Sequence, residues 1–400
     1  MMTDYRLSYS HLLADLHQAY LDARRHKRNK SYQLRFEAQM DVNLEELCRQ
    51  LWTRTYRPLP SCCFVITDPK RREVFAAQFR DRIVHHLYYN YTHEMLERTF
   101  IQDTYSCIRQ RGTHYGIRRL ERHIRCESHN YTQSCYVLKM DISGYFMHIC
   151  RQRLYDITIQ RLTKMASHRI SKYAAETWRQ RVDMDFVKYL THLIIMLDPI
   201  ESCCRRGSLF DWYGLPPEKS LMNSPEGCGL PIGNLTSQLF SNVYLNEFDQ
   251  YMKRQLHCHR YGRYVDDFYV VSTDRNWLRS LQQPITKFLE SQLGLTVNDN
   301  KTTIRDVRYG IEFLGAYLKP RRRYVSNTAL QRIRTKVPSL RVQENGELLR
   351  SRLNSFLGIL SHFKTYHIRR ELFFHLPNVY RYGYYLKGMT KFVLYPRAPE

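Results

Sequence analysis

The sequence predicts an α+β fold that ends in a smaller, basic and helical unit. Strand-like and helix-like segments alternate in the middle of the 400-residue chain. From Lys319 to Arg370 the pattern is helical, with 13 Lys or Arg residues against two acids. With 43% hydrophobic and 25% charged residues, the chain can bury a sizeable core. Its length predicts roughly two to three compact units.

The expected elements follow from apolar periodicity and from turn residues. Residues 5–56 have apolar positions near helical spacing, and Pro58 and Pro60 follow them. We expect strands at 64–66, 136–140 and 297–318, and two strands joined by a tight turn at 263–271. We expect helices at 74–93, 235–248, 277–293 and beyond Pro320. We expect residues 151–228 to begin as helix and to continue, from 201 to 226, as a polar loop.

The charge of the chain indicates a polyanionic partner. There are 62 Lys or Arg residues against 38 Asp or Glu residues, a formal net charge of +24. The longest apolar runs, such as residues 193–197, are too short to span a bilayer, and the charged N-terminal segment is not a secretory signal. We therefore expect a cytoplasmic protein that binds nucleic acid and no membrane.

The eleven cysteines favour reduced thiols. They include two adjacent pairs, and no C-x-x-C spacing occurs. A metal site remains the alternative at two places, around Cys203, Cys204 and Cys228, or at the His257-Cys258-His259 triplet.

Two adjacent carboxylates give the sharpest chemical signal. Asp266 and Asp267 lie between apolar strands, and like charges packed at a turn resist burial unless a cation compensates them. Asp141 also ends an apolar strand. If the strand ends lie side by side, these acids can share two Mg²⁺ ions about 3.5–4 Å apart. The alternative is a solvated hairpin turn.

These carboxylates lie in segments that resemble the palm of reverse transcriptases. The segments are YVDD at 264–267 and MDISGYF at 140–146, with finger-like motifs at 69–85 and 103–112, a lysine motif at Lys301 and a primer-grip turn at 313–315. The resemblance implies a right-hand polymerase fold. Its N-terminal region and fingers would be residues 1–135, its palm 136–150 and 229–318, an insertion 151–228, and its basic helical thumb 319–400.

The resemblance also implies a role for individual residues. Asp141, Asp266, Asp267 and Lys301 would be catalytic, and two Mg²⁺ ions would be bound at Asp141, Ile142, Asp266 and Asp267. Residues expected to contact the incoming dNTP are Arg72, Arg82, Arg109, Gly144, Tyr145, Phe146 (as a steric gate against a 2′-hydroxyl) and Ile232. Residues expected to contact template or primer are Gly233, Ser237, Gln238, Phe313, Leu314 and Gly315.

A subfamily signal lies in the segment GLPIGNLTSQLFSNVYLNEFD, residues 229–249. Most reverse transcriptases have Pro-Gln-Gly where this chain has Pro231-Ile232-Gly233, and Ser237-Gln238 follows. This form resembles the enzymes of diversity-generating retroelements. The resemblance implies copying of a template-repeat RNA into cDNA with errors at template adenines, transfer of that cDNA into a variable gene, and a small basic oligomeric accessory protein as partner. The resemblance also implies that the enzyme binds the RNA–DNA hybrid.

Plainer interpretations stay open. Phe146 is alternatively a core residue, Lys301 a surface lysine, Gln238 a helix-packing residue, and each arginine part of a solvated basic face. The other function classes are a retron-like, group II intron-like or abortive-infection reverse transcriptase, and a non-catalytic RNA-binding protein. The intact acids at 141, 266 and 267 favour an enzyme.

Overall fold

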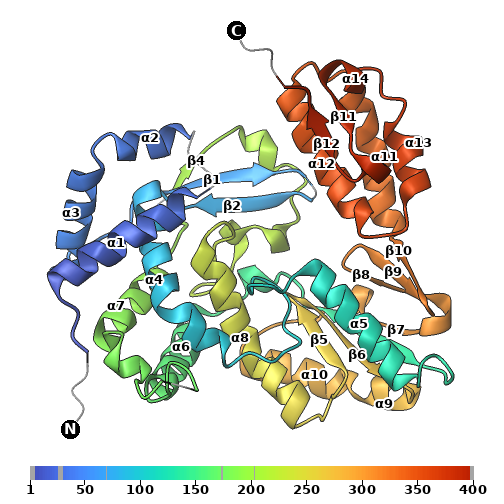
Figure 1. Ribbon diagram of the computed structural model, residues 1–400. Helices are drawn as coiled ribbons and strands as arrows, with labels where there is room; N and C mark the ends of the chain where they lie inside the picture. Colours follow the sequence, from blue (N-terminus) through green and yellow to red (C-terminus); the bar gives the residue numbers. More distant parts are fainter. Residues whose placement is uncertain (1–4, 26–29, 69, 173, 202, 397–400) are drawn as a thin grey trace. The chain divides into compact units, whose positions relative to one another are not determined.

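The computed structural model describes residues 5–25, 30–68, 70–172, 174–201 and 203–396 (Figure 1). The chain forms two compact units. The first unit contains Met1–Gly112, Lys139–Val270 and Arg279–Thr302, and the second contains Thr113–Leu138, Val271–Leu278 and Thr303–Glu400. Each unit therefore combines segments that lie far apart in the sequence.

Helices form the N-terminal part of the first unit. Ser8 caps the first helix, since its hydroxyl accepts a bond from the backbone N–H of His11. This helix packs along α3 and α4 and buries Leu12 and Leu16 (Figure 1). The prediction of helix over residues 5–56 is confirmed for α1 (Tyr9–Arg24), α2 (Ser31–Glu37) and α3 (Met40–Trp52), whereas residues 5–8 and 53–56 are not helical and residues 26–29 lie outside the described residues.

A small sheet follows these helices. Strands β1 (Ser61–Ile66) and β2 (Arg72–Ala76) pair in antiparallel fashion, and β4 (Cys203–Arg205) pairs with β1 in parallel. The predicted helix over 74–93 is wrong at its start. Residues 72–76 alternate between more and less buried positions, as a half-covered strand does, and helix α4 (Phe79–Glu97) begins later.

The sheet that contains the predicted hairpin confirms three sequence predictions. Strand β6 (Asp267–Ser272) lies between β5 (Tyr261–Tyr264) and β3 (Tyr136–Asp141). Helix α8 (Leu235–Arg254) packs on this sheet, since the ring centroids of Phe248 and Phe268 lie 5.0 Å apart. The predicted strand at 136–140, hairpin at 263–271 and helix at 235–248 are all present.

The remaining elements of the first unit are helices and short turns. Helix α8 packs against α4 and α6, and α7 packs against α6. Residues 201–226 are mainly loop, as expected, apart from β4 and short 3₁₀ turns, and residue 202 lies outside the described residues. The elements are α6 (Arg151–Ala166), η2 (Trp178–Gln180), α7 (Met184–Met196), η3 (Leu209–Trp212), η4 (Pro217–Lys219), η5 (Leu221–Asn223), α10 (Gln282–Phe288), the π-helical η6 (Leu289–Leu293) and η7 (Asp299–Lys301).

The second unit begins with helix α5 (Thr113–Glu127) and a small antiparallel sheet of order β10-β9-β8. The predicted strand over 297–318 is correct only in part, because a 3₁₀ turn occupies Asp299–Lys301. The elements of this part are α9 (Arg275–Ser280), which extends into the first unit, β7 (Thr303–Asp306), η8 (Val307–Tyr309), β8 (Ile311–Phe313), β9 (Ala316–Lys319) and β10 (Arg322–Val325).

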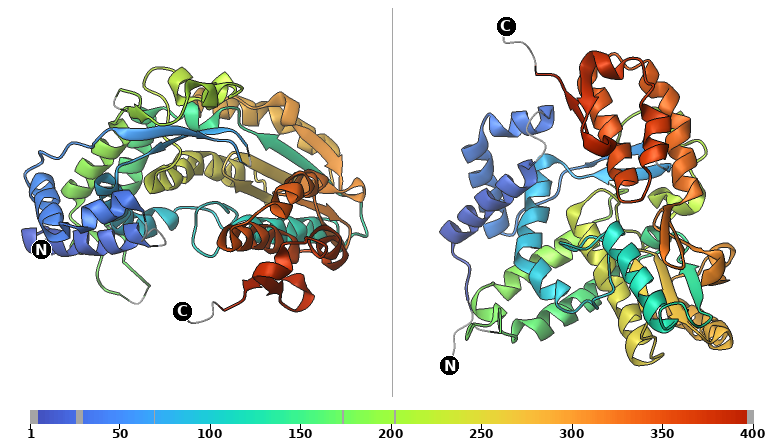
Figure 2. Two further views of the ribbon diagram at one scale, coloured as in Figure 1. Left: turned by 90° about the horizontal axis from the view of Figure 1, so that it is seen from above. Right: turned by 45° about the vertical axis from the view of Figure 1, so that its right-hand side comes forward.

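The C-terminal part of the second unit is a group of helices with one hairpin, drawn in orange to red in Figures 1 and 2. The prediction of helices alone beyond Pro320 is wrong for β10 and for the hairpin of β11 (Gly383–Tyr385) and β12 (Phe392–Leu394). The hairpin packs on α12. The helices are α11 (Asn327–Arg341), α12 (Gly346–Ser361), α13 (Tyr366–Phe373), α14 (Val379–Tyr382) and η9 (Lys387–Met389).

The cysteines and the helices bear on two further expectations. All eleven cysteines are free thiols. Burial raises the pKa of Cys63 and of Cys135 to about 12, so these thiols stay protonated and act as small apolar side chains. Across the described part of the chain, no helix combines the length and the apolar character that crossing a membrane requires.

Candidate active site

A two-residue turn carries the first predicted catalytic carboxylate. Tyr264 of β5 pairs with Asp267 of β6, so Val265 and Asp266 form the loop of a hairpin. Val265 has a φ of 55°, which is strained for a β-branched residue. A positive φ at the first loop residue alone is typical of a type II′ turn. This turn places Asp266 and Asp267 together at the tip of the hairpin.

Asp141 lies beside this turn. It is the last residue of β3, and β3 is the neighbour of β6 in the sheet. The backbone N–H of Ile142 donates to the carbonyl oxygen of Asp266 at 3.2 Å. The carbonyl oxygen of Asp141 accepts a bond from the N–H of Asn298 at 2.8 Å. The structure therefore brings Asp141 to the pair Asp266 and Asp267.

Burial and repulsion raise the pKa of two of these carboxyls. Burial, together with the charge of Asp141, raises the pKa of Asp266 to about 6. Burial also raises the pKa of Asp267 to about 6, although the nearby Lys139 opposes that shift. The Lys139 ammonium lies 3.7 Å from a carboxylate oxygen of Asp267. Lys301 donates to a carboxylate oxygen of Asp141 at 2.5 Å. Two lysines thus partly neutralise three clustered acids.

The chemistry of these donors fits a divalent cation. Within the described ranges, no group of three or more His, Cys, Asp or Glu side chains forms a ready metal site. The ammonium of Lys301 instead occupies one oxygen of Asp141. The raised pKa values of Asp266 and Asp267 show that ionising the acids together is unfavourable, and a cation would relieve this repulsion. Carboxylate and carbonyl oxygens are the ligands that Mg²⁺ prefers.

Metal affinity at this site is expected to depend on pH. Because Asp266 and Asp267 have pKa values of about 6, both carboxyls take up protons as the pH falls through 6, and a cation must displace them. Below pH 6 the Mg²⁺ affinity should fall about tenfold per pH unit for each proton displaced. Calorimetric titration in buffers of different ionisation enthalpy counts those protons. An affinity that is constant from pH 5 to pH 8 would contradict the assignment.

The same shifts predict the opposite trend for the metal-free fold. The ordinary pKa of these acids is 3.8, so between about pH 4 and 6 the folded chain binds more protons than the unfolded chain. The free energy of unfolding should therefore decrease as the pH rises through that window. Added Mg²⁺ should oppose this decrease, because it binds the ionised acids in the folded chain, and its stabilising effect should be complete above pH 6.

A buried ion pair supports the hairpin. Arg263 and Asp249 are both fully buried, and the guanidinium donates two bonds to the carboxylate, at 2.8 and 2.6 Å. Asp249 accepts further bonds from the hydroxyls of Thr104 and Tyr261. Arg263 also donates to the carbonyl oxygen of Val265 at 2.9 Å. The paired acid thus satisfies the buried arginine, and the arginine holds the strained turn residue.

The N–H of Val265 is held as well. It donates to the hydroxyl of Ser106 at 3.2 Å, and Asn242 donates to the carbonyl oxygen of Ser106 at 2.8 Å. The ion pair below this turn was not predicted from the sequence. The available signal was a charged residue, Arg263, inside a strand that is otherwise apolar or aromatic.

The loop before α8 lies against β2 and the start of α4. The carbonyl oxygen of Ile232 accepts a bond from the N–H of Phe75 at 2.8 Å, and the side chain of Asn234 accepts one from the N–H of Ala77 at 3.2 Å. Gly233 has a φ of 130° between these contacts. A Cβ at Gly233 would lie 2.8 Å from Val74 and 2.9 Å from the carbonyl oxygen of Phe75. Glycine is the residue that permits this approach.

Gly233→Ala is expected to displace this loop. The added methyl group meets backbone as well as side chain, so the free energy of unfolding should fall by about 1–3 kcal/mol. Single-nucleotide incorporation should fall too, because Ile232 moves with the loop. Urea unfolding and incorporation assays measure the two effects. Gly227→Ala is the matched control, since Gly227 has a φ of 67° and open space around the missing Cβ. Equal effects of the two variants would contradict this account.

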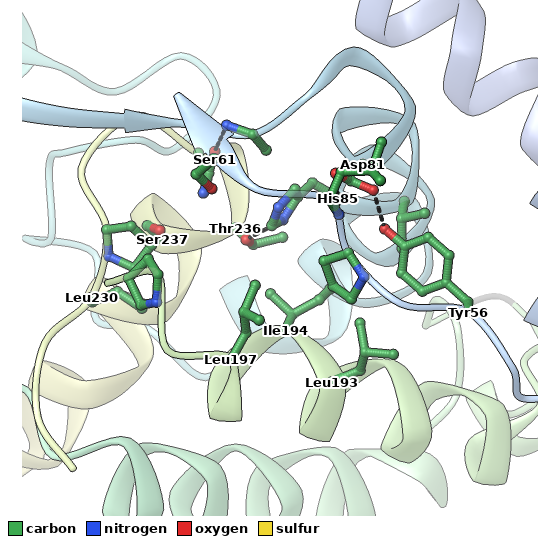
Figure 3. A pocket seen from close by; sticks show the side chains of 17 residues that line it. Tyr56, Ser61, Asp81, His85, Leu193, Ile194, Leu197, Leu230, Thr236 and Ser237 are labelled. Atoms are coloured by element: carbon green, nitrogen blue, oxygen red, sulfur yellow. Dashed lines mark hydrogen bonds between the residues drawn. The ribbon is translucent and has the colours of Figure 1, made fainter. Parts of the chain in front are cut away.

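A small pocket lies beneath the same loop (Figure 3). His85 and Thr236 approach to 2.7 Å there, and the hydroxyl of Tyr56 donates to Asp81 at 2.6 Å (Figure 3). Ser237 lines the pocket and is 3% exposed, which favours a packing position for its side chain. The next residue, Gln238, is exposed. Of the pair Ser237-Gln238, the glutamine therefore has the side chain that a template strand can reach.

Phe146 and Ile232 share one apolar environment. Both pack, partly buried, against a core cluster of Cys63, Phe75, Met147 and Leu221. The carbonyl oxygen of Phe146 accepts a bond from the N–H of Leu230, which ties it to the loop. The structure thus brings together the predicted steric gate and Ile232, which was also expected to contact the incoming dNTP.

The turn before Phe146 contains the two residues expected to bind phosphate through their backbone. Gly144 has a φ of 52°, and a Cβ there would lie 2.8 Å from the carbonyl oxygen of Glu218. The side chain of Tyr145 is buried, and its hydroxyl donates to the carbonyl oxygen of Ser241 at 2.6 Å. Only the backbone of Tyr145 is therefore available to a nucleotide.

The three arginines expected near the triphosphate differ in their settings. Arg72 is exposed on β2, and its charge acts to lower the pKa of Asp266, so it lies within electrostatic reach of the acids. Arg82 donates to the carbonyl oxygen of Ala77 at 2.8 Å and to the hydroxyl of Tyr32 at 3.1 Å. Arg109 is exposed beyond α4, and no contact recorded for the described residues joins it to the acids.

The predicted primer-grip turn belongs to the second unit. Phe313 of β8 pairs with Ala316 of β9, which leaves Leu314 and Gly315 as a two-residue loop. Both loop residues have positive φ, 50° and 79°, as in a type I′ hairpin turn. Phe313 is buried. The contact of this turn with a primer stays a prediction.

Comparison with known proteins identifies the family. A sequence model described as reverse transcriptase (RNA-dependent DNA polymerase) matches residues 70–318. The chain belongs to the reverse transcriptase family. The match spans Asp141, Asp266, Asp267 and Lys301. Family membership and the mixture of helices with antiparallel sheets confirm the predicted α+β right-hand polymerase fold. They also confirm the predicted enzyme class, because RNA-directed DNA polymerase is the activity of this family.

Individual relatives of this reverse transcriptase are distant. Protein YkfC of Escherichia coli (strain K12) is 25% identical over 358 residues, which cover 78% of this chain and 84% of that protein. The apo telomerase of Candida tropicalis aligns in structure with a TM-score of 0.48, 9% identity and 79% coverage of this chain. Candida albicans telomerase in complex with a telomeric RNA fragment aligns with a TM-score of 0.44, 11% identity and 81% coverage. The chain spans 60% and 58% of those two telomerase chains.

Proposed function

We propose that this chain synthesises DNA on an RNA template, with Asp141, Asp266 and Asp267 holding two Mg²⁺ ions. The observation that carries the proposal is the meeting of two chain segments: the Ile142 N–H bonds the Asp266 carbonyl, which places three acids from β3 and the β5–β6 turn at one point. The carbonyl oxygen of Ile142 is the further candidate metal ligand. When bound, the ions would stabilise the negative charge that develops on the phosphate oxygens.

The reaction forms a bond between the primer 3′-oxygen and the α-phosphorus of the dNTP, and it breaks the bond from that phosphorus to the pyrophosphate oxygen. The proton of the primer 3′-hydroxyl passes to solvent. Lys301 would protonate the leaving pyrophosphate. Burial is the largest single influence on the pKa of Lys301 and lowers it, but the bond to Asp141 and the charges of Asp141, Asp266 and Asp267 together outweigh burial and raise that pKa. The ammonium is therefore charged at neutral pH and has a proton to give.

The remaining site residues would orient the nucleotide. Arg72 and Arg82 supply charge-assisted donors for the triphosphate, and the backbone N–H groups of Gly144 and Tyr145 add neutral donors at a tight turn. Phe146 would lie under the sugar and exclude a 2′-hydroxyl by contact. Arg109 remains a candidate for the same triphosphate.

Primer extension tests this function. The purified chain should extend a DNA primer on an RNA template with dNTPs and Mg²⁺, and excess EDTA should stop it. Phe146→Ala should raise incorporation of ribonucleotides relative to deoxynucleotides by about tenfold or more, because the ring no longer meets the 2′-hydroxyl. A chain that binds the hybrid but extends no primer under any divalent cation would refute the proposal and favour an RNA-binding protein.

We infer further that the enzyme is of the diversity-generating type. Support comes from Pro231-Ile232-Gly233 and Ser237-Gln238 and from the apolar packing of Ile232. The aliphatic side chain offers no hydrogen bond to a base or sugar. The product would be cDNA with errors at template adenines, intended for a variable gene, and a small basic oligomeric protein would assist.

Ile232→Gln is expected to raise fidelity. A glutamine restores a polar group that can discriminate between correct and mismatched pairs, and such discrimination is worth about 1–3 kcal/mol. We expect errors at template adenines to fall about tenfold. Sequencing of cDNA made on an adenine-rich RNA measures this, with Ile232→Leu as the size-matched control. Unchanged adenine errors with Ile232→Gln would count against a role for residue 232 in fidelity.

A further inference from the structure

The second unit contains an open basic pocket that the polymerase site does not use. Its volume is about 580 Å³. Three arginines and three tyrosines line it: Arg275, Arg305, Arg308, Tyr136, Tyr309 and Tyr317. All of them belong to the second unit, and none is among the predicted catalytic, nucleotide or primer residues.

The pocket carries net positive charge. Its one acid, Asp306, is paired with Arg308, whose guanidinium donates to it at 2.8 Å. Arg275 and Arg305 add two positive charges that no second acid of the lining offsets. Arg275, Arg305 and Arg308 are all exposed. A polyanion is therefore the class of ligand that the charge favours.

The aromatic part of the pocket is fixed by the backbone. The hydroxyl of Tyr317 donates to the carbonyl oxygen of Tyr309, and a Cβ at Gly310 would lie 2.4 Å from the ring of Tyr317. The close packing of Tyr317 on this turn thus depends on a glycine with a φ of 86°. Tyr309, next to that glycine, is 70% exposed, so its ring is available for stacking.

We propose that this pocket binds single-stranded RNA. Arg275 and Arg305 bind phosphates, and the exposed ring of Tyr309 stacks on a base. Arginines beside an exposed aromatic ring favour a nucleic acid over an acidic peptide, because an acidic side chain gains nothing from a stacking platform. This role goes beyond DNA synthesis itself, because the pocket is a second RNA-binding site outside the catalytic residues.

Binding to two probes tests this site. One probe is a short blunt RNA–DNA hybrid, and the other is the same hybrid with a long single-stranded RNA extension. In the double variant Arg305→Ala/Tyr309→Ala, affinity for the extended probe should fall about tenfold. The slope of log K against log salt should become less steep by about 0.7, as expected for one lost phosphate contact on a single strand. Affinity for the blunt probe and incorporation on it should not change.

The matched control removes one charge and one exposed ring elsewhere. Arg254 is exposed at the end of α8, and Tyr213 is 83% exposed, so Arg254→Ala/Tyr213→Ala should leave both affinities unchanged. An equal loss in the control, or an equal loss on the blunt probe, would overturn the proposal. A labelled polyglutamate peptide provides a second test. If the peptide binds the parent chain but not the pocket variant, while the variant still binds RNA, the proposal is overturned in favour of an acidic protein partner.

Discussion

Asp266→Asn is expected to lower single-nucleotide incorporation by about a thousandfold while it stabilises the metal-free fold. The first effect corresponds to about 4 kcal/mol of lost transition-state stabilisation. The second follows from the raised pKa of this acid, which burial and Asp141 cause. Because the charged form is unfavourable in the fold, its neutral isostere should raise the free energy of unfolding by about 1–2 kcal/mol at pH 8. Rapid-quench kinetics and urea unfolding without Mg²⁺ measure the two effects.

The opposite directions of these effects separate a catalytic role from a structural one. Asp156→Asn is the matched control, because Asp156 is exposed on α6 and should change neither quantity. A loss of activity with an equal loss of stability would show that Asp266 supports the fold. Retained activity would remove Asp266 from the metal site.

Arg263→Ala is expected to be the most destabilising single change near the site. It leaves the carboxylate of Asp249 buried without its main partner, and breaking a buried pair in this way costs about 3–5 kcal/mol. The carbonyl oxygen of Val265 also loses its donor. Incorporation should therefore fall even at temperatures where the variant remains folded. Thermal unfolding and incorporation at low temperature measure both effects.

A double variant separates stability from positioning. Arg263→Met combined with Asp249→Leu removes both charges, so the free energy of unfolding should recover to within about 2 kcal/mol of the parent. Activity should stay low, because neither new side chain can donate to the turn at Val265. If the double variant regains the parent activity, the hairpin does not depend on Arg263 for its geometry.

The sequence was sufficient to predict the elements that carry the site. Apolar runs on both sides of Asp266 and Asp267 predict a hairpin, and the run before Asp141 predicts a strand, because apolar side chains in short runs favour buried strands. To predict that Asp141 lies close to Asp266 and Asp267, the order of the strands in the sheet must also be known. A single acid at a strand end does not encode that order, and here the resemblance supplied it.

Other features depend on distant contacts that local patterns do not contain. Residues 72–76 form a strand, although helix was predicted from residue 74, because β1 offers a partner for them and Glu73 accepts bonds from Trp212, Ser220 and the backbone of Leu221. The buried pair of Arg263 and Asp249 likewise joins two elements. In each case the sequence alone predicts a surface position for the polar residue, because its buried partner lies far away in the chain.

Iron-mediated cleavage of the chain tests the central claim most directly. With Fe²⁺ in place of Mg²⁺, and with ascorbate and peroxide, radicals cut the backbone close to the bound metal. We predict cuts in two segments, one around Asp141 and Ile142 and one around Asp266 and Asp267, and we predict that excess Mg²⁺ suppresses both together. Cleavage at one segment alone, or cleavage at both that Mg²⁺ does not suppress, would contradict a shared metal site formed by these acids.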